Sequence, residues 1–461
     1  MRQLAIAAVV LLGLSLAGST AGRGGEPRVE RVSGPLRVFR ANPRYFADVR
    51  GRPVYLTGSH VWWNLVGNRT WNAECKAGPA QPFSFQAYLN ELGKYGHNFI
   101  RLWTLEQTSW QEWCGGEWVR VAPHPWARTG PGNAKDDLPK FDLGRFDDAY
   151  FRRLRSRVAA AQRRGIYVSV MLFEGFGTAW LKHAWQFHPF NAANNVNGID
   201  GDINRDGKGV EVHTLAQRAV TKLQERYVRR VIDTVNGYDN VLYEVANEPG
   251  ARSVEWQYHM VKLVRSYEAR KRKRHPVGMT LAAPDGWNDQ LYRSRADWVS
   301  PGGRRYLSDP PAANRSKVSI LDTDHVCGIC GGWDVVWKNF TRGHNVIFMD
   351  PQDSSPERVV ARWAMGHTRR YAQRMNLARA IPHPGLASTR YCLADPSREF
   401  LVYDADGGQL TIDLSRAPGQ LRGEWFRPLS GRATPTTVSG GARRTLSAPF
   451  SGAAVLYLKR R

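Results

Sequence analysis

Short apolar segments alternate with helix-like segments along most of the chain. Strand-like runs lie at residues 55–58, 98–103, 166–173, 240–246, 277–282, 297–300, 318–322 and 345–349. Helical periodicity and capping residues predict helices at 84–95, 147–164, 214–235, 253–273, 333–342 and 357–375, with a shorter segment near 289. The strand-like runs are continuously rich in Val, Ile and Leu, as strands buried on both faces are. Eight such βα units predict an α/β fold, a (β/α)8 TIM barrel, and not an open sheet.

The pattern changes toward both ends of the chain. Residues 38–56 predict two short strands around a turn at 50–53. From about residue 380, strand-like segments at 400–403, 409–414, 423–427 and 453–458 alternate with Gly, Pro and Ser turns. This pattern is typical of a small antiparallel β-sandwich. We therefore expect a barrel over 38–379, a sandwich over 380–461 and a leader or linker over 22–37.

The first residues predict export. An apolar run from Leu4 to Ala17 follows Arg2 and ends in small residues, as a secretory signal peptide does, so residues 1–21 are expected to be removed. No later stretch approaches the ~20 apolar residues that cross a bilayer. We expect a secreted or periplasmic protein with no membrane span.

The charge balance is strongly basic. Lys and Arg total 65 against 41 Asp and Glu, a formal net charge of +24. An exported protein meets polysaccharide more often than nucleic acid, so no nucleic-acid partner is expected, and an anionic glycan is the polyanion that fits. A solvated basic face is the alternative interpretation. The densest run, 270–275, falls at the end of a predicted helix, where cations complement the helix dipole.

The five cysteines leave at least one thiol unpaired within the chain. Cys75 and Cys114 lie in neighbouring polar loops and are candidates for a disulfide. Cys327 and Cys330 form a C-x-x-C close to several acidic residues, but their spacing matches no zinc site. A disulfide or two unreactive thiols is therefore favoured there.

Reacting groups of a TIM barrel lie at the carboxyl ends of its strands. The candidates are the residues that end six of the eight runs: Ser59, His60, Arg101, Trp103, Glu174, Asn247, Glu248, Asp322, Asp324, His325 and Asp350. Arg101 is expected either to keep a neighbouring carboxylate ionised or to form a structural ion pair. Asp350 precedes Pro351, which favours a turn-capping role over a catalytic one.

Glycoside hydrolysis needs two carboxyl groups, one protonated and one ionised. The run VLYEVANEPG at 241–250 resembles the strand-four motif of the large clan of TIM-barrel retaining glycosidases, in which Asn-Glu is followed by Pro. The resemblance implies that Glu248 is the general acid/base and that Asn247 binds the sugar 2-hydroxyl. Strand seven of that clan usually ends in Glu, whereas this chain has KVSILDTDH. Asp322 falls at the nucleophile position, and Asp324 is the reserve, on the same side if the strand continues.

Four runs together resemble the secreted apiosidase-like glycoside hydrolase family: YFADVRGRPVYLTGSHVWWNL, HNFIRLWTLE, LDTDHVCGICG and RGHNVIFMDP. Members often carry a C-terminal domain labelled the collagen-binding domain of a collagenase. The resemblance covers almost the whole mature chain and implies a retaining hydrolase of O-glycosidic bonds in plant or microbial polysaccharide. Such an enzyme requires no cofactor. The alternatives are a catalytically silent carbohydrate- or matrix-binding protein and a polyanion-binding protein driven by the basic charge.

Tryptophans are concentrated in the loops after the first three strands, at positions 62, 63, 103, 110, 113, 118, 180 and 185. Indole faces stack on sugar rings, although core packing is the alternative for each. Their concentration favours a pocket. We expect its substrate-binding residues to be Trp62, Trp63, Trp103, His60, Arg101, Glu174, Asn247 and His325.

One loop alternates oxygen-bearing side chains, as calcium loops do: Asp200, Asp202, Asn204, Asp206 and Glu211. If the loop starts at Asp200, its sixth residue is Arg205 where glycine is expected. If it starts at Asp202, Gly207 fits, but the twelfth residue is His213. A structural calcium site and an ordinary turn-rich loop both remain as interpretations.

Overall fold

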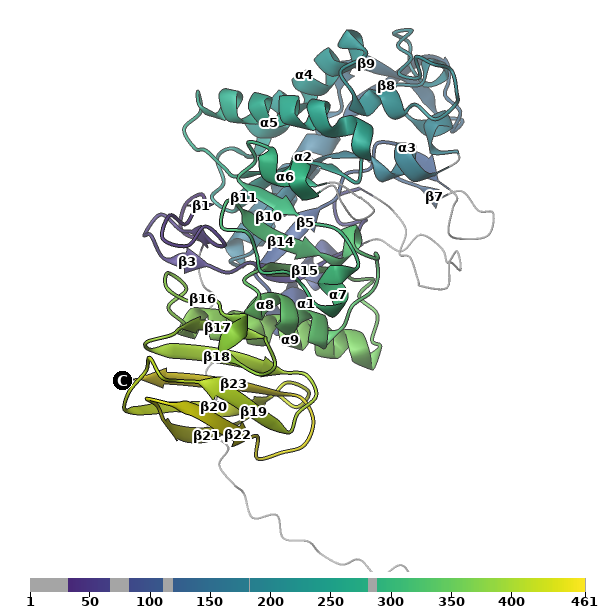
Figure 1. Ribbon diagram of the computed structural model, residues 1–461. Helices are drawn as coiled ribbons and strands as arrows, with labels where there is room; N and C mark the ends of the chain where they lie inside the picture. Colours follow the sequence, from purple (N-terminus) through teal and green to yellow (C-terminus); the bar gives the residue numbers. More distant parts are fainter. Residues whose placement is uncertain (1–31, 67–82, 111–118, 182, 281–287, 461) are drawn as a thin grey trace, which may run out of the picture.

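The computed structural model describes residues 32–66, 83–110, 119–181, 183–280 and 288–460 (Figure 1). The predicted signal peptide, the Cys75–Cys114 pair, Trp113, Trp118 and the side chain of Trp110 lie outside the described residues. Within the described ranges, no helix is both long and apolar enough to cross a membrane.

Eight parallel strands form the centre of the molecule. They are β4 (Thr57–His60), β5 (Phe99–Leu102), β10 (Tyr167–Glu174), β11 (Val241–Asn247), β12 (Val277–Thr280), β13 (Trp298–Ser300), β14 (Val318–Asp322) and β15 (Asn345–Met349). Their order is β4-β15-β14-β13-β12-β11-β10-β5. The circle closes between β5 and β4, where the Asn98 N–H donates to the Thr57 carbonyl at 3.0 Å. The prediction of a TIM barrel from eight apolar runs is confirmed.

The helices between the strands are amphipathic. The chief ones are α1 (Phe85–Lys94), α2 (Asp148–Arg163), α4 (Arg218–Val235), α5 (Val254–Glu268), α8 (Trp333–Thr341) and α9 (Pro356–Arg374), with short α6 (Asn288–Arg293) and α7 (Arg305–Ser308). Ser84 and Asp147 cap α1 and α2 as their positions predicted. The basic run ends α5 early, because Lys271 and Lys273 turn back to pair with Asp233 and Asp239 on and after α4.

Two parts of the barrel fall outside the simple βα repeat. A hairpin of β8 (Trp126–Asn133) and β9 (Pro139–Phe146) precedes α2. A long excursion between β10 and α4 contains α3 (Phe176–Trp180) and three 3-10 turns, η1 (Ala184–Phe187), η2 (Ala192–Asn194) and η3 (Val210–His213). Smaller sheets are β1 (Arg37–Val38), β2 (Phe46–Ala47) and β3 (Pro53–Val54), and β6 (Ser109–Trp110) with β7 (Val119–Arg120).

The C-terminal part is antiparallel, as predicted. A six-stranded sheet contains β16 (Ile381–Pro382), β17 (Cys392–Asp395), β18 (Glu399–Asp404), β23 (Ala454–Arg460), β20 (Gln420–Arg427) and β21 (Arg432–Ser439). A pair, β19 (Gln409–Asp413) and β22 (Arg443–Ser447), packs on one face. The opposite face lies against α8 and α9, as Figure 1 shows, through a cluster that includes Trp337, Tyr371, Tyr403 and Phe426.

Candidate active site

Arg101 occupies the centre of the carboxyl end of the barrel. Its side chain in β5 is 2% exposed and binds acidic or amide groups from two other strand ends. Nε and Nη2 donate to the two oxygens of Glu244, and Nη2 also donates to Asn247 Oδ1 at 2.7 Å. Nη1 donates to Asp322 Oδ2 and to Asp324 Oδ2, each at 3.0 Å. The guanidinium therefore joins β5 to β11 and to the end of β14, and every hydrogen bond has a charged or amide acceptor.

Asp322, the last residue of β14, is held from two sides. His60 Nε2 lies 3.0 Å from Oδ1 and 2.9 Å from Oδ2. The Trp103 indole N–H donates to His60 Nδ1 at 2.9 Å, so the imidazole proton lies on Nε2 and is donated to Asp322. Burial alone would raise the pKa of Asp322, but His60 and Arg101 hold it well below its ordinary value. Asp322 is therefore ionised, and both of its oxygens are occupied.

Asp324 lies two residues after Asp322, in the 3-10 turn η5 (Thr323–His325). The strand does not continue past Asp322, because the Asp322 carboxylate accepts the Asp324 N–H at 3.0 Å and begins this turn. Both carboxylates nevertheless reach Arg101. Burial raises the pKa of Asp324 to about 6, against the attraction of Arg101. Its Oδ1 makes no hydrogen bond with any residue that the structure describes, so this oxygen is available to a ligand.

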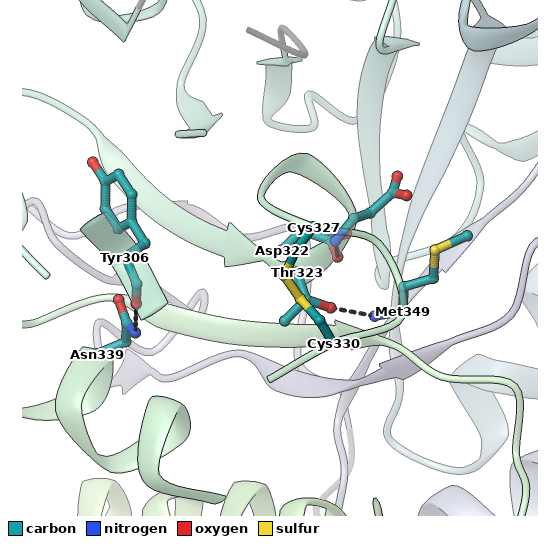
Figure 2. Close-up of a disulfide and its surroundings, with 8 residues drawn as sticks. Tyr306, Asp322, Thr323, Cys327, Cys330, Asn339 and Met349 are labelled. Carbon is teal, nitrogen blue, oxygen red and sulfur yellow. Dashed lines mark hydrogen bonds between the residues drawn. A yellow bond between two sulfur atoms is a disulfide. The ribbon is translucent and has the colours of Figure 1, made fainter. Parts of the chain in front are cut away.

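A disulfide follows the 3-10 turn that carries Asp324. Cys327 and Cys330 are bonded, one of the two predicted states, directly beneath the end of β14 (Figure 2). The Thr323 carbonyl accepts three backbone N–H groups of this loop. The Thr323 hydroxyl accepts the Met349 N–H at 3.0 Å, which ties the loop to the end of β15 (Figure 2). Thr323, next to Asp324, is therefore fixed by the following loop and by β15.

Glu248 follows β11 in a strained turn. Its φ of +46° lies in the left-handed region, which a non-glycine residue adopts at an energetic cost and which is most often found at functional sites. Gly175 allows the turn, because a Cβ there would lie 2.3 Å from Pro249 Cα. Burial, followed by the negative charge of Asp324, raises the pKa of Glu248 well above its ordinary value. The surroundings of Glu248 therefore favour its protonated form, while those of Asp322 favour its ionised form.

Asn247 and His325 form a neighbouring pair. His325 Nε2 lies 3.1 Å from Asn247 Oδ1, and Ser300 Oγ lies 2.7 Å from His325 Nδ1. Burial lowers the pKa of His325 to about 3, so the ring is neutral, accepts from Ser300 and donates to Asn247. Since Arg101 donates to the same oxygen, the Asn247 amide is oriented with its NH2 group free to donate to a ligand.

Glu174 is a third carboxyl group at this end of the barrel. It ends β10 opposite Asn247 in the parallel register and is 1% exposed. One oxygen accepts the Gly177 N–H at 3.2 Å, and the other has no partner among the described residues. Burial raises the pKa of Glu174 to about 8. Behind it, Glu106 accepts from the Glu174 N–H at 3.1 Å and contacts His213 Nε2 at 2.7 Å.

The three tryptophans expected to bind substrate, Trp62, Trp63 and Trp103, are buried. Trp62 and Trp63 are 2% and 5% exposed and meet edge to face. The Trp103 N–H is used by His60. Trp185 is buried as well and stacks on His188. Trp180, at the end of α3, differs from these four, since 53% of it is exposed.

The oxygen-rich loop from Asp200 to Glu211 folds through side-chain-to-backbone bonds. Asp202 accepts the N–H groups of Asp206 and Gly207, and Asn204 Nδ2 donates to Glu211. In the described part of the chain, no group of three or more His, Cys, Asp or Glu side chains is arranged to hold a metal ion. A structural calcium stays a prediction, which a melting curve before and after exhaustive chelation would test.

Two further acidic residues, Asp350 and Glu244, form buried ion pairs with arginines. Asp350 binds Arg362 through both oxygens, at 2.6 and 2.7 Å, and accepts the Gln352 N–H, so it caps the turn after β15 as expected. Glu244 was not among the candidates. A charged residue inside the apolar run VLYEVAN was the available signal, because a carboxylate buried in a barrel needs a buried cation.

Comparisons with known proteins agree with this architecture. Residues 111–285 match the model of a domain of unknown function, DUF6298. No curated protein matches the chain. A solved structure described as a glycoside hydrolase superposes with a TM-score of 0.59 at 13% identity and covers 92% of this chain and 97% of its own. A family 5 glycoside hydrolase from Bacteroides vulgatus ATCC 8482 superposes with a TM-score of 0.59 at 15% identity and covers 94% of this chain and 95% of its own. At these identities, the likeness establishes the shared fold.

Proposed function

We propose that the chain is a glycoside hydrolase that cleaves O-glycosidic bonds in plant or microbial polysaccharide by a retaining mechanism. One observation carries the proposal. Asp322 and Asp324 both bind the Arg101 guanidinium at the carboxyl end of the barrel, near the buried Glu248 carboxyl group, whose pKa is raised well above its ordinary value. This is the acid and carboxylate pairing that glycoside hydrolysis needs.

In the first step, Glu248 donates its proton to the glycosidic oxygen as the bond from that oxygen to the anomeric carbon breaks. A carboxylate oxygen of the aspartate pair attacks the anomeric carbon and forms a glycosyl ester. In the second step, Glu248, now ionised, removes a proton from water. The water oxygen displaces the carboxylate and releases the sugar with its original configuration.

We assign the attack to Asp324. Both oxygens of Asp322 are hydrogen-bonded, whereas Asp324 Oδ1 has no partner among the described residues. Asp322 and His60 would then act as positioning residues that hold Arg101 and the turn. The Asn247 amide, oriented by Arg101 and His325, would donate to the sugar 2-hydroxyl.

The likeness to the two glycoside hydrolase structures supports a carbohydrate substrate, since both share this barrel along nearly their whole length. The motifs of the apiosidase-like family support the same assignment, including a C-terminal domain of the collagenase-associated type. The leader supports secretion or a periplasmic location. The formal charge of +24 favours an anionic polysaccharide within this class.

Carboxylate variants test the proposal. Glu248→Gln should keep the wild-type melting temperature and reduce turnover of cell-wall polysaccharide by roughly 10²–10⁴-fold, because it removes general acid catalysis. Asp324→Asn should abolish formation of the ester. Glu91→Gln, on the exposed end of α1, is the matched control and should be fully active.

The product configuration decides the mechanism. Proton NMR of the first-formed product should show retention. In Asp324→Ala, added azide should yield a glycosyl azide of inverted configuration, and in Glu248→Ala a glycosyl azide of retained configuration. Full activity in Glu248→Gln, or an inverted product from the wild type, would refute the proposal. An azide product of inverted configuration from Asp322→Ala alone would transfer the nucleophile role to Asp322.

A further inference from the structure

Helix α3 packs against the turn that carries Glu248, the proposed general acid. Gly175, just before the helix, donates its N–H to the Asn247 carbonyl at 2.7 Å and lies against Pro249. At the other end of the helix, a Cβ on Gly250 would lie 3.9 Å from Ala179 Cβ. The helix therefore follows the Glu248 turn on one side along its full length.

The remaining sides of α3 are also occupied. A Cβ on Gly177 would lie 2.6 Å from the Gln107 amide, and Thr178 Oγ1 lies 3.4 Å from His213 Nδ1. Leu181, directly after the helix, is 8% exposed and belongs to the main apolar cluster. The backbone position of Trp180 is thus fixed by its neighbours.

Trp180 is the one residue of α3 that is exposed, at 53%. Within the described residues, no aromatic ring packs on the indole and no cation lies over it. Burial of an indole is favourable, so an exposed one on a rigid support leaves a large apolar face available to a ligand. Its place at the carboxyl end of the barrel is where substrates of this fold bind.

We propose that Trp180 is a stacking platform for the sugar unit on the leaving-group side of the cleaved bond. The inference rests on the proposed function. A general acid touches the leaving-group oxygen, and α3 packs on the turn of Glu248, whereas Asp322 and Asp324 are held across the site by Arg101 and His60. A sugar ring stacked on Trp180 therefore belongs to the part of the substrate that lies beyond the oxygen that Glu248 protonates.

This placement defines the substrate class. An enzyme that removes a sugar from a small alcohol gains nothing from a platform beyond the leaving oxygen. A platform there favours an oligosaccharide or polysaccharide that extends past the cleaved bond, because stacking stabilises the correct register of the chain before cleavage.

Binding tests the platform without turnover. In the Glu248→Gln background, oligosaccharides released from plant and microbial cell walls are titrated by calorimetry with and without Trp180→Ala. The alanine change should weaken binding roughly 10- to 100-fold, as loss of one buried aromatic contact does, and Trp180→Phe should restore most of the affinity. Trp363→Ala is the matched control, since this second exposed indole packs on Tyr95 at the opposite end of the barrel. Equal affinity in Trp180→Ala, or no bound oligosaccharide at all, would overturn the inference.

Turnover separates this inference from the proposed function. With a glycosyl fluoride, whose leaving group has no ring, Trp180→Ala should react like the wild type, while kcat/KM for the oligosaccharide should fall roughly 10- to 100-fold. An equal loss on both substrates would contradict a leaving-group platform. A wild type that binds oligosaccharide through Trp180 and hydrolyses neither substrate would refute the proposed function and leave the platform supported.

Discussion

Asp322 and Asp324 bind the same nitrogen of Arg101 and yet have opposite pKa shifts. Asp322 receives additional hydrogen bonds from His60 and from the Asp324 N–H, which favour its charged form. Asp324 has the same guanidinium but also the neighbouring negative charge of Asp322. Although both carboxylates bind the same guanidinium, Asp322 thus stays ionised, whereas Asp324 titrates at a raised pKa.

The pH dependence of catalysis should report this difference. If Asp324 attacks, kcat/KM should fall as the pH drops below about 6, because protonation removes the nucleophile. If Asp322 attacks instead, activity should persist to far lower pH. The measurement is kcat/KM against pH on a glycosyl fluoride for the wild type and for Asp322→Asn, which should keep an acid limb if Asp324 attacks.

Glu174 should make the folded state less stable as the pH rises. Its pKa is about 8 in the folded protein against an ordinary value of 4.5, so the folded state holds a proton that the unfolded state has lost. Stability from this group is complete below about pH 4.5 and is lost by about pH 8, at up to about 1.4 kcal/mol per pH unit. Glu174→Gln should flatten the fall in the free energy of unfolding over that window, as measured by urea denaturation. Parallel curves for the two proteins would contradict a protonated Glu174.

At the scale of the elements, the sequence predicted the regular repeats better than their ends. Apolar runs located all eight barrel strands, since strands buried on both faces have a continuous apolar signature. The hairpin of β8 and β9 was not predicted, because WARTGPGN and PKFDLGRF mix charged residues with Gly and Pro. The run 318–322 predicted both ends of β14, but the 3-10 turn η5 after it was not predicted, because the Asp322 carboxylate begins this turn through a local hydrogen bond and not through periodicity.

The candidate site was predictable to the level of residue type and strand end. Glu248, Asn247, Arg101, Asp322 and Asp324 do lie together, because carboxyl ends of barrel strands converge. Which of these side chains bind one another depends on contacts across the barrel between residues far apart in the sequence. No local sequence pattern indicates such contacts. Glu244 is the clearest example, since its cation is 143 residues away.

The contact between α3 and the Glu248 turn should be intolerant of a single methyl group. Gly175→Ala would place a Cβ 2.3 Å from Pro249 Cα, so the turn must shift. We expect a loss of activity of at least tenfold with a destabilisation of about 1–3 kcal/mol, as overpacked sites show. Gly237→Ala is the control, because a Cβ there meets nothing within 4 Å. Unchanged activity and melting temperature in Gly175→Ala would show that the turn is not fixed by α3.

In the whole molecule, barrel and C-terminal sheets share one apolar cluster. Tyr371 and Trp337 of the barrel helices pack against Phe426 and Tyr403 of the six-stranded sheet. The Tyr371 hydroxyl also donates to Glu424 at 2.7 Å. The sheet is therefore covered on both faces, by the barrel on one and by β19 and β22 on the other.

A substitution in this cluster should destabilise barrel and sheet together. Phe426→Ala should reduce the free energy of unfolding by about 3–5 kcal/mol and lower the temperature at which activity is lost. Leu429→Ala, on an exposed position of the same sheet region, should have an effect within about 0.5 kcal/mol. Calorimetry should show one transition for each protein. A separate low-temperature transition with full activity retained above it would mean that the two parts unfold independently.

The partners of Arg101 also constrain when the protein can become functional during synthesis. The guanidinium is in the second barrel strand, its acidic partners are 143 to 223 residues later, and His60 in the first strand meets Asp322 across 262 residues. A nascent chain that has not yet emerged past β14 contains Glu244 but lacks Asp322 and Asp324, so two of the carboxylates that bind Arg101 are missing. Activity should therefore return late in refolding, with closure of the barrel and not with formation of its helices.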